Sequence, residues 1–270
     1  MYYLPCNDDI IFLDNGWVVS VWDTISNIVY LVMGIAGMFL THRDTLRRLN
    51  ITTAAEFRAT ARPLVTSWNC TLLYAWIIMI GMASTVYHST LQPWSLCMDF
   101  FAIKIFALLI IWSLGHALSF FHGTVYLAVG VTTLAITGGL MGIASLWPEM
   151  QRYSTGTYNV LVTMLMGTVY ALILYHLSVS NAIEATTWEE SVMLKYHRRY
   201  HRRARRNLIT STSLFAIALV FYFLPKVACD EYRHSEYAVF MKMHAYWHVF
   251  SAISLYFCVR AISFLHHGSG

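Results

Sequence analysis

Long apolar stretches alternate with short polar segments along the whole chain. A helix that crosses a bilayer needs about 20 mostly apolar residues, and seven stretches meet this requirement. They cover residues 20–40, 64–87, 96–115, 120–146, 157–178, 208–228 and 237–265. No internal repeat or low-complexity segment divides the pattern. The sequence therefore predicts an all-α fold: a seven-transmembrane helix bundle that forms a single integral membrane domain over residues 1–270.

The composition supports a membrane environment. Of the 270 residues, 57% are apolar and 12% are charged, whereas soluble domains contain about 25% charged residues. A soluble protein of this composition would lack the polar surface to cover its apolar side chains. The same figures exclude a disordered chain, a collagen and a coiled coil. Residues 1–16 contain no Lys or Arg, so we do not expect a cleaved signal peptide.

Basic residues gather in two segments and predict the orientation. Residues 41–63 and 195–206 contain 12 of the 18 Lys and Arg, and they follow the first and fifth predicted spans as loops. With seven spans both loops fall on one side, which the positive-inside rule assigns to the cytosol. The N-terminal segment 1–19 is then lumenal and the C-terminus cytosolic. We expect the basic segments to attract membrane lipids rather than nucleic acid, because no aromatic stacking platform accompanies them.

Several polar residues occur within the predicted spans, where charge is costly and usually marks function. Ser84 and His88 end the second span, Asp99 begins the third, and His244 and His248 lie in the seventh. Each pair is four residues apart and therefore shares one helical face. The alternating direction of the spans puts all five residues at a similar depth, near the lumenal side.

This set of side chains is typical of a catalytic zinc site. Three imidazoles, from His88, His244 and His248, leave the fourth tetrahedral position open. A nearby carboxylate, here Asp99, can hold and deprotonate a water molecule whose pKa the metal lowers. The alternative is that each histidine is a hydrogen-bonded packing residue. Two pairs and an acid at one depth favour the metal site.

Two of the five cysteines fall outside the predicted spans. Cys6 lies in the N-terminal segment and Cys229 in the predicted connection between the sixth and seventh spans, both on the lumenal, oxidising side. We expect these two to form a disulfide, with two free thiols as the alternative. The other three cysteines lie within spans.

The motifs resemble those of the alkaline ceramidases, in the superfamily that includes the adiponectin-type receptors. That family has a Ser, a His four residues later, an Asp eleven further on, and His-Ala-x-Trp-His late in the chain. Here these are Ser84, His88, Asp99 and residues 244–248. Near the start, residues 22–27 (Trp-Asp-Thr-Ile-Ser-Asn) resemble the family's Trp-Asn-Thr-x-Ser-Asn.

The resemblance implies a seven-helix bundle with an intramembrane zinc ion. It implies hydrolysis of the amide of ceramide to a sphingoid base and a fatty acid. In that reading His88, His244 and His248 bind Zn²⁺, and Asp99 orients the water and acts as general base. Ser84 hydrogen-bonds the water or the developing oxyanion. We expect the protein in the endoplasmic reticulum or the Golgi.

The chain departs from the family at two places. Phe100 follows Asp99 where the family often has an acidic residue. At the family's N-terminal calcium site, Ser20 stands where the family has a Glu. Oxygen ligands for Ca²⁺ could come from Asp8, Asp9 and Asp14. The alternative for these three residues is a solvated acidic segment.

Two other functions remain open at this stage. One is a seven-helix receptor or sensor of the adiponectin-receptor type, and the other is a related hydrolase of lipid esters. The receptors usually have a cytosolic N-terminus, whereas the basic segments here predict a lumenal one. The His-Ala-x-Trp-His motif at residues 244–248 favours the ceramidase.

Overall fold

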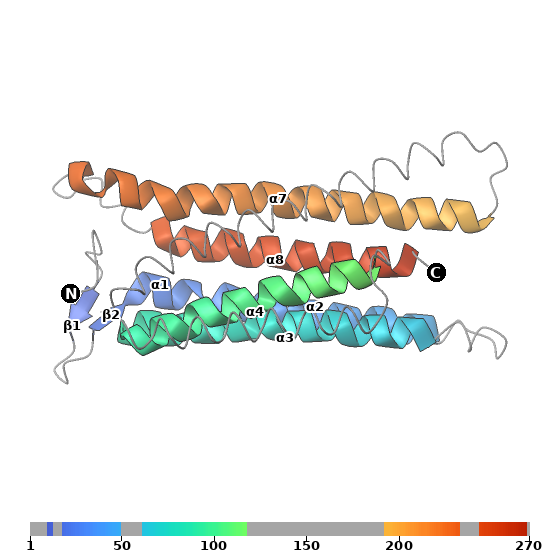
Figure 1. Cartoon of the computed structure of the whole chain (residues 1–270), viewed down its shortest axis with the longest axis horizontal. Coiled ribbons are helices and arrows are strands. Elements are labelled where there is room, and N and C mark those ends of the chain that lie inside the picture. Colours follow the sequence, from blue (N-terminus) through green and yellow to red (C-terminus); the bar gives the residue numbers. More distant parts are fainter. Residues whose placement is uncertain (1–9, 13–17, 50–60, 118–191, 233–242, 269–270) are drawn as a thin grey trace.

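A computed structural model of the chain describes residues 10–12, 18–49, 61–117, 192–232 and 243–268. Long helices lie side by side along one axis (Figure 1). The elements are β1 (Ile10–Phe12), β2 (Val18–Ser20), α1 (Val21–Ser26), α2 (Ile28–Leu49), α3 (Ala61–Thr90), α4 (Pro93–Ala117), α7 (Val192–Tyr232) and α8 (Met243–Gly268). The predicted helical class is therefore confirmed for the described residues. The fourth and fifth predicted spans, 120–146 and 157–178, lie outside them.

Among the described residues, four helical segments are long and apolar enough to cross a membrane, which indicates a membrane protein. They are Val21–Leu46, Trp68–Thr90, Arg199–Phe223 and Met243–Leu265. Many of their large apolar side chains, such as Phe39, Met79 and Val220, are exposed. Exposed apolar surface of this extent is what a bilayer covers.

A small sheet precedes the first helix, in the segment predicted to be lumenal. β1 and β2 pair antiparallel, with Ile10 opposite Ser20. The first predicted span is not one helix, because α1 ends at Ser26 and α2 begins at Ile28. The break follows a short polar segment, Asp23-Thr24-Ile25-Ser26-Asn27. A hydropathy average over the whole span does not single this segment out.

The prediction that residues 195–206 form a basic loop is wrong. This segment is helical and belongs to the 41-residue helix α7. Likewise α2 extends through the arginines that follow the first apolar stretch, as far as Leu49. Arg and Lys are good helix formers, so α2 and α7 do not end where their apolar residues end.

Helices α2 and α3 pack closely because glycines lie at their contact. A Cβ atom on Gly34 would lie 2.9 Å from the carbonyl oxygen of Tyr74, and one on Gly37 would overlap the Tyr74 ring. Tyr74 is fully buried. Small residues at helix contacts let backbones approach in this way in membrane proteins.

Helices α7 and α8 are joined by reciprocal hydrogen bonds between serines. Ser211 Oγ donates to the carbonyl oxygen of Ser254 at 2.8 Å, and Ser254 Oγ donates to that of Ser211 at 2.8 Å. At the end of the bundle away from the β-hairpin, Arg260 of α8 forms an ion pair with Asp44 of α2 at 3.2 Å. The hairpin end gathers α1, the end of α3 and the starts of α4 and α8 (Figure 1).

Candidate metal centre

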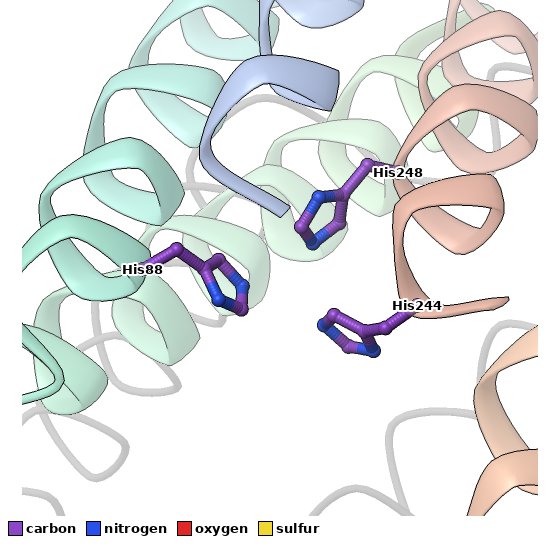
Figure 2. A group of neighbouring side chains, drawn as sticks. All are labelled: His88, His244 and His248. Carbon is purple, nitrogen blue, oxygen red and sulfur yellow. The ribbon is translucent and has the colours of Figure 1, made fainter. Parts of the chain in front are cut away.

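Three histidines from two helices point toward one another at the hairpin end of the bundle (Figure 2). His88 comes from the last turns of α3, and His244 and His248 from the first turns of α8. One ring nitrogen from each lies within 4.8 Å of those from the other two. His88 and His248 are buried and His244 is partly buried. The structure thus brings together the three residues that the sequence predicts as metal ligands.

The turn between α3 and α4 places the acidic residue beside this cluster. Leu91 has a left-handed backbone with φ 49°, and its N–H donates to the carbonyl oxygen of Tyr87 at 2.7 Å. A left-handed residue commonly ends a helix, and Pro93 then begins α4, a position that proline favours. This tight reversal folds α4 back along α3.

As a result, Ser84 and Asp99 face each other across the two helices. Both are buried, and their side chains interact electrostatically. Asp99 also interacts electrostatically with Tyr87, whose ring centroid is 4.7 Å from that of His88. The serine and the carboxylate are therefore linked to His88 through Tyr87.

The structure adds contacts that the sequence analysis did not predict. His248 Nδ1 lies 2.8 Å from Ser26 Oγ and 3.1 Å from the carbonyl oxygen of Asp23. His88 Nδ1 lies 3.7 Å from Asp23 Oδ2. Residues 22–27 were noted as a motif, but their spacing alone does not indicate that they approach helices far away in sequence.

Aromatic side chains of α7 and α8 lie beside the partly buried His244. Tyr222 of α7 lies 6.1 Å from His244 and 5.0 Å from Trp247, measured between ring centroids. Phe215, also of α7, lies 6.0 Å from Trp247. The histidine cluster therefore adjoins a group of aromatic rings that joins α7 to α8.

The residues present fit a bound metal ion. All three donors are imidazole nitrogens, the ligands that suit zinc and several other transition metals. Their spread of 4.8 Å or less is near the separation of about 3.4 Å that two nitrogens have on a tetrahedral zinc. Nδ1 of His88 is buried and makes no hydrogen bond, with Asp23 Oδ2 3.7 Å away, so its ring has room to turn when a ligand binds. This cluster could therefore hold a metal ion.

Two predicted sites lie outside the described residues. The disulfide partner Cys6 and the calcium candidates Asp8, Asp9 and Asp14 belong to segments that the structure does not describe. Cys229 was predicted in a connection between helices, but it belongs to α7, which continues to Tyr232. At this end, as at its basic N-terminal end, α7 continues beyond its apolar stretch.

Comparison with known proteins supports the resemblance drawn from the motifs. The family model described as Ceramidase matches residues 15–269, which is nearly the whole chain. The predicted resemblance is thereby confirmed. A search of the curated proteins finds no match.

Proposed function

This chain belongs to the ceramidase family, and from that premise we propose that it hydrolyses the amide bond of ceramide in a zinc-dependent reaction. The products are a sphingoid base and a free fatty acid. One observation carries the zinc dependence: His88, His244 and His248 converge from two helices in a chain that the family model covers from residue 15 to residue 269. Family membership supports an amidohydrolase in general.

His88, His244 and His248 would hold the metal. When bound, zinc would supply Lewis acidity, which polarises the amide carbonyl and lowers the pKa of a water molecule. Two of the ligands come from one face of α8, so the helix itself fixes their spacing. The third comes from α3, so packing of α3 against α8 completes the set.

Asp99 is the proposed general base. Its carboxylate lies beside Ser84, and it would accept the proton of the attacking water. Asp99 would then return this proton to the departing amine, so that the sphingoid base leaves as a neutral product. A positioned general base or acid contributes about 10²–10⁴-fold to a rate.

Ser84 is the proposed hydrogen-bond donor of the site. It lies one turn before His88 on the same face of α3. Its hydroxyl can orient the Asp99 carboxylate or stabilise the negative charge that develops on the amide oxygen. In either role, Ser84 acts directly on Asp99 or on the amide that reacts.

The position of the site suits a lipid substrate. His88 lies near the end of α3, and His244 and His248 lie near the start of α8. These helix ends lie at one end of the bundle (Figure 1), which we propose is the depth of the polar amide of a two-chain lipid. The apolar faces of the helices would then contact the lipid chains. We propose an integral membrane location in the endoplasmic reticulum or the Golgi, with the N-terminus lumenal and the C-terminus cytosolic. Protease protection of tagged termini tests this orientation.

The decisive experiment incubates the purified full-length protein with a panel of ceramides, with and without a zinc chelator. We expect release of fatty acid, its loss on chelation and its return with added zinc. Hydrolysis that survives complete removal of metal would overturn the zinc dependence. Bound zinc without hydrolysis of any ceramide would overturn the enzymatic proposal and place the protein with the receptor class. Hydrolysis of lipid esters instead would change the substrate.

A further inference from the structure

The short helix α1 contacts two of the three histidines from outside their own helices. His248 Nδ1 lies 3.1 Å from the carbonyl oxygen of Asp23, which can accept a hydrogen bond but cannot donate one. Ser26 donates its own hydrogen to this same carbonyl at 2.9 Å, so the Ser26 oxygen, 2.8 Å from His248 Nδ1, is free to accept. Both contacts place the hydrogen of His248 on Nδ1 and leave Nε2 with its lone pair.

The side chain of Asp23 faces the second histidine. Its Oδ2 lies 3.7 Å from Nδ1 of His88, and both side chains are almost fully buried, at 4% and 6% exposure. Ser20 donates a hydrogen bond to this same Oδ2 at 2.8 Å, which fixes the direction of the carboxylate. The gap to His88 exceeds a normal N–H···O distance by about 0.5–1 Å, which a small tilt of the imidazole ring would close.

Asp23 lies near the end of α1, which ends at Ser26. The last four carbonyl groups of a helix commonly accept hydrogen bonds from outside its own ladder, and a carbonyl oxygen can accept two hydrogen bonds. The Asp23 carbonyl accepts from Ser26 Oγ and lies 3.1 Å from His248 Nδ1. Asp23 thus presents a main-chain oxygen and a carboxylate to the histidines from one residue.

We propose that Asp23 is a positioning residue for the metal centre and serves two ligands with two different oxygens. Its carbonyl holds His248, its carboxylate holds His88, and both imidazoles are left with Nε2 directed to the metal. Ligating histidines generally donate their other ring N–H to a carboxylate or a carbonyl, and loss of such a partner lowers metal affinity about 10–100-fold. This inference rests on the proposed function, because it requires that the cluster bind a metal.

The test uses the full-length protein in detergent and reads metal binding rather than activity. Zinc affinity is measured by competition with a chelator, and ligand geometry by the visible absorption of the cobalt(II)-loaded protein. Asp23→Ala should bind zinc about 10–100-fold more weakly and should shift the cobalt spectrum. Asp23→Asn keeps an oxygen acceptor at the same place, and it matches the family's motif. It should retain an affinity within a few fold of wild type. Asp44→Ala, which removes a carboxylate from the ion pair at the other end of the bundle, is the matched control and should change neither reading.

A merely structural role would give a different pattern. Asp23→Ala would then lower the unfolding temperature but leave zinc affinity and the cobalt spectrum as in wild type, and this result would overturn the inference. If Asp23→Ala does not fold, Ser20→Ala becomes the test variant. It keeps the Asp23 carboxylate but removes the hydroxyl that donates to this carboxylate at 2.8 Å. A shifted cobalt spectrum in Ser20→Ala supports the inference, and an unchanged one overturns it. Wild-type protein that binds no zinc would instead overturn the proposed function itself.

Discussion

The imidazole rings of His88 and His248 meet edge to face with their centroids 4.9 Å apart, although α3 carries one and α8 the other. His244 lies 5.2 Å from the first ring and 4.7 Å from the second. Edge-to-face contact between rings is favourable by only about 0.5–1.5 kcal/mol. Such contacts alone give little reason to gather three imidazoles at one point, whereas the zinc ion that we propose would use all three.

We expect purified wild-type protein to contain about one zinc ion per chain, since three imidazoles with an open fourth position form one catalytic-type site. The double variant His88→Ala, His244→Ala removes two of the three ligands and should abolish binding. Metal analysis of protein purified without added zinc provides the measurement. Unchanged zinc in the double variant would show that the ion binds elsewhere.

Asp99→Asn should lower ceramide hydrolysis by about 10²-fold or more, the usual contribution of a general base. The amide keeps the shape of the carboxyl group, so the variant should stay folded and keep most of its zinc. Turnover is measured as fatty acid released, alongside metal analysis of the same sample. Asp44→Asn, a carboxylate paired with Arg260 far from the site, is the matched control. Wild-type activity in Asp99→Asn would reject Asp99 as the base.

Ser84→Ala should have a smaller effect than Asp99→Asn, because it removes one hydrogen bond to a charged group, worth about 1.5–3 kcal/mol. Ser84 and Asp99 adjoin each other, and residues that act as a unit are not additive. The double variant should therefore fall little below Asp99→Asn alone. Strictly multiplicative losses would mean that the two side chains act independently.

Gly37→Ala should destabilise the protein even though alanine is the better helix former, by about 1 kcal/mol. The new Cβ would overlap the ring of Tyr74, which is fully buried and cannot move aside without displacing its neighbours. Overpacking of this kind costs about 1–3 kcal/mol. Thermal unfolding in detergent measures it, with Ala216→Val on the exposed face of α7 as control. A raised unfolding temperature in Gly37→Ala would contradict the close packing of α2 on α3.

The predicted bridge between Cys6 and Cys229 is tested by thiol labelling of denatured, unreduced protein. We expect neither cysteine to react before reduction and both to react after it, because an oxidising compartment preserves such a pair. A Cys6→Ser variant should expose Cys229 to the reagent. Labelling of both positions without reduction would favour two free thiols.

The helical class and the meeting of the three histidines could be predicted from the sequence because both depend on local regularities. An apolar stretch of sufficient length predicts a span wherever it occurs, and a spacing of four residues puts His244 and His248 on one face of any helix. The depth argument then predicted that His88 would lie near that pair, and the structure brings the three rings together. The catalytic roles of Ser84 and Asp99 stay a prediction.

The ends of the helices could not be predicted in this way. Hydropathy marks the membrane boundary, whereas a helix ends where its backbone finds other partners. The charged residues 195–206 favour a helix as strongly as the apolar ones that follow, so α7 includes them. At α1 the reverse holds, because the helix breaks at Asn27 inside a stretch that is apolar enough on average to cross a membrane.

The sequence by itself determined that this chain is helical, is suited to a membrane and carries two pairs of polar residues at helical spacing, because periodicity and length are local properties. Only the tertiary structure decided that Asp23 meets both His88 and His248. That contact joins α1, α3 and α8, and it depends on the turn at Leu91, the glycine contacts of α2 with α3 and the break after Ser26 together. Each of these features is local, but the distance between Asp23 and the two rings is set by how whole helices pack, which no spacing along the chain specifies.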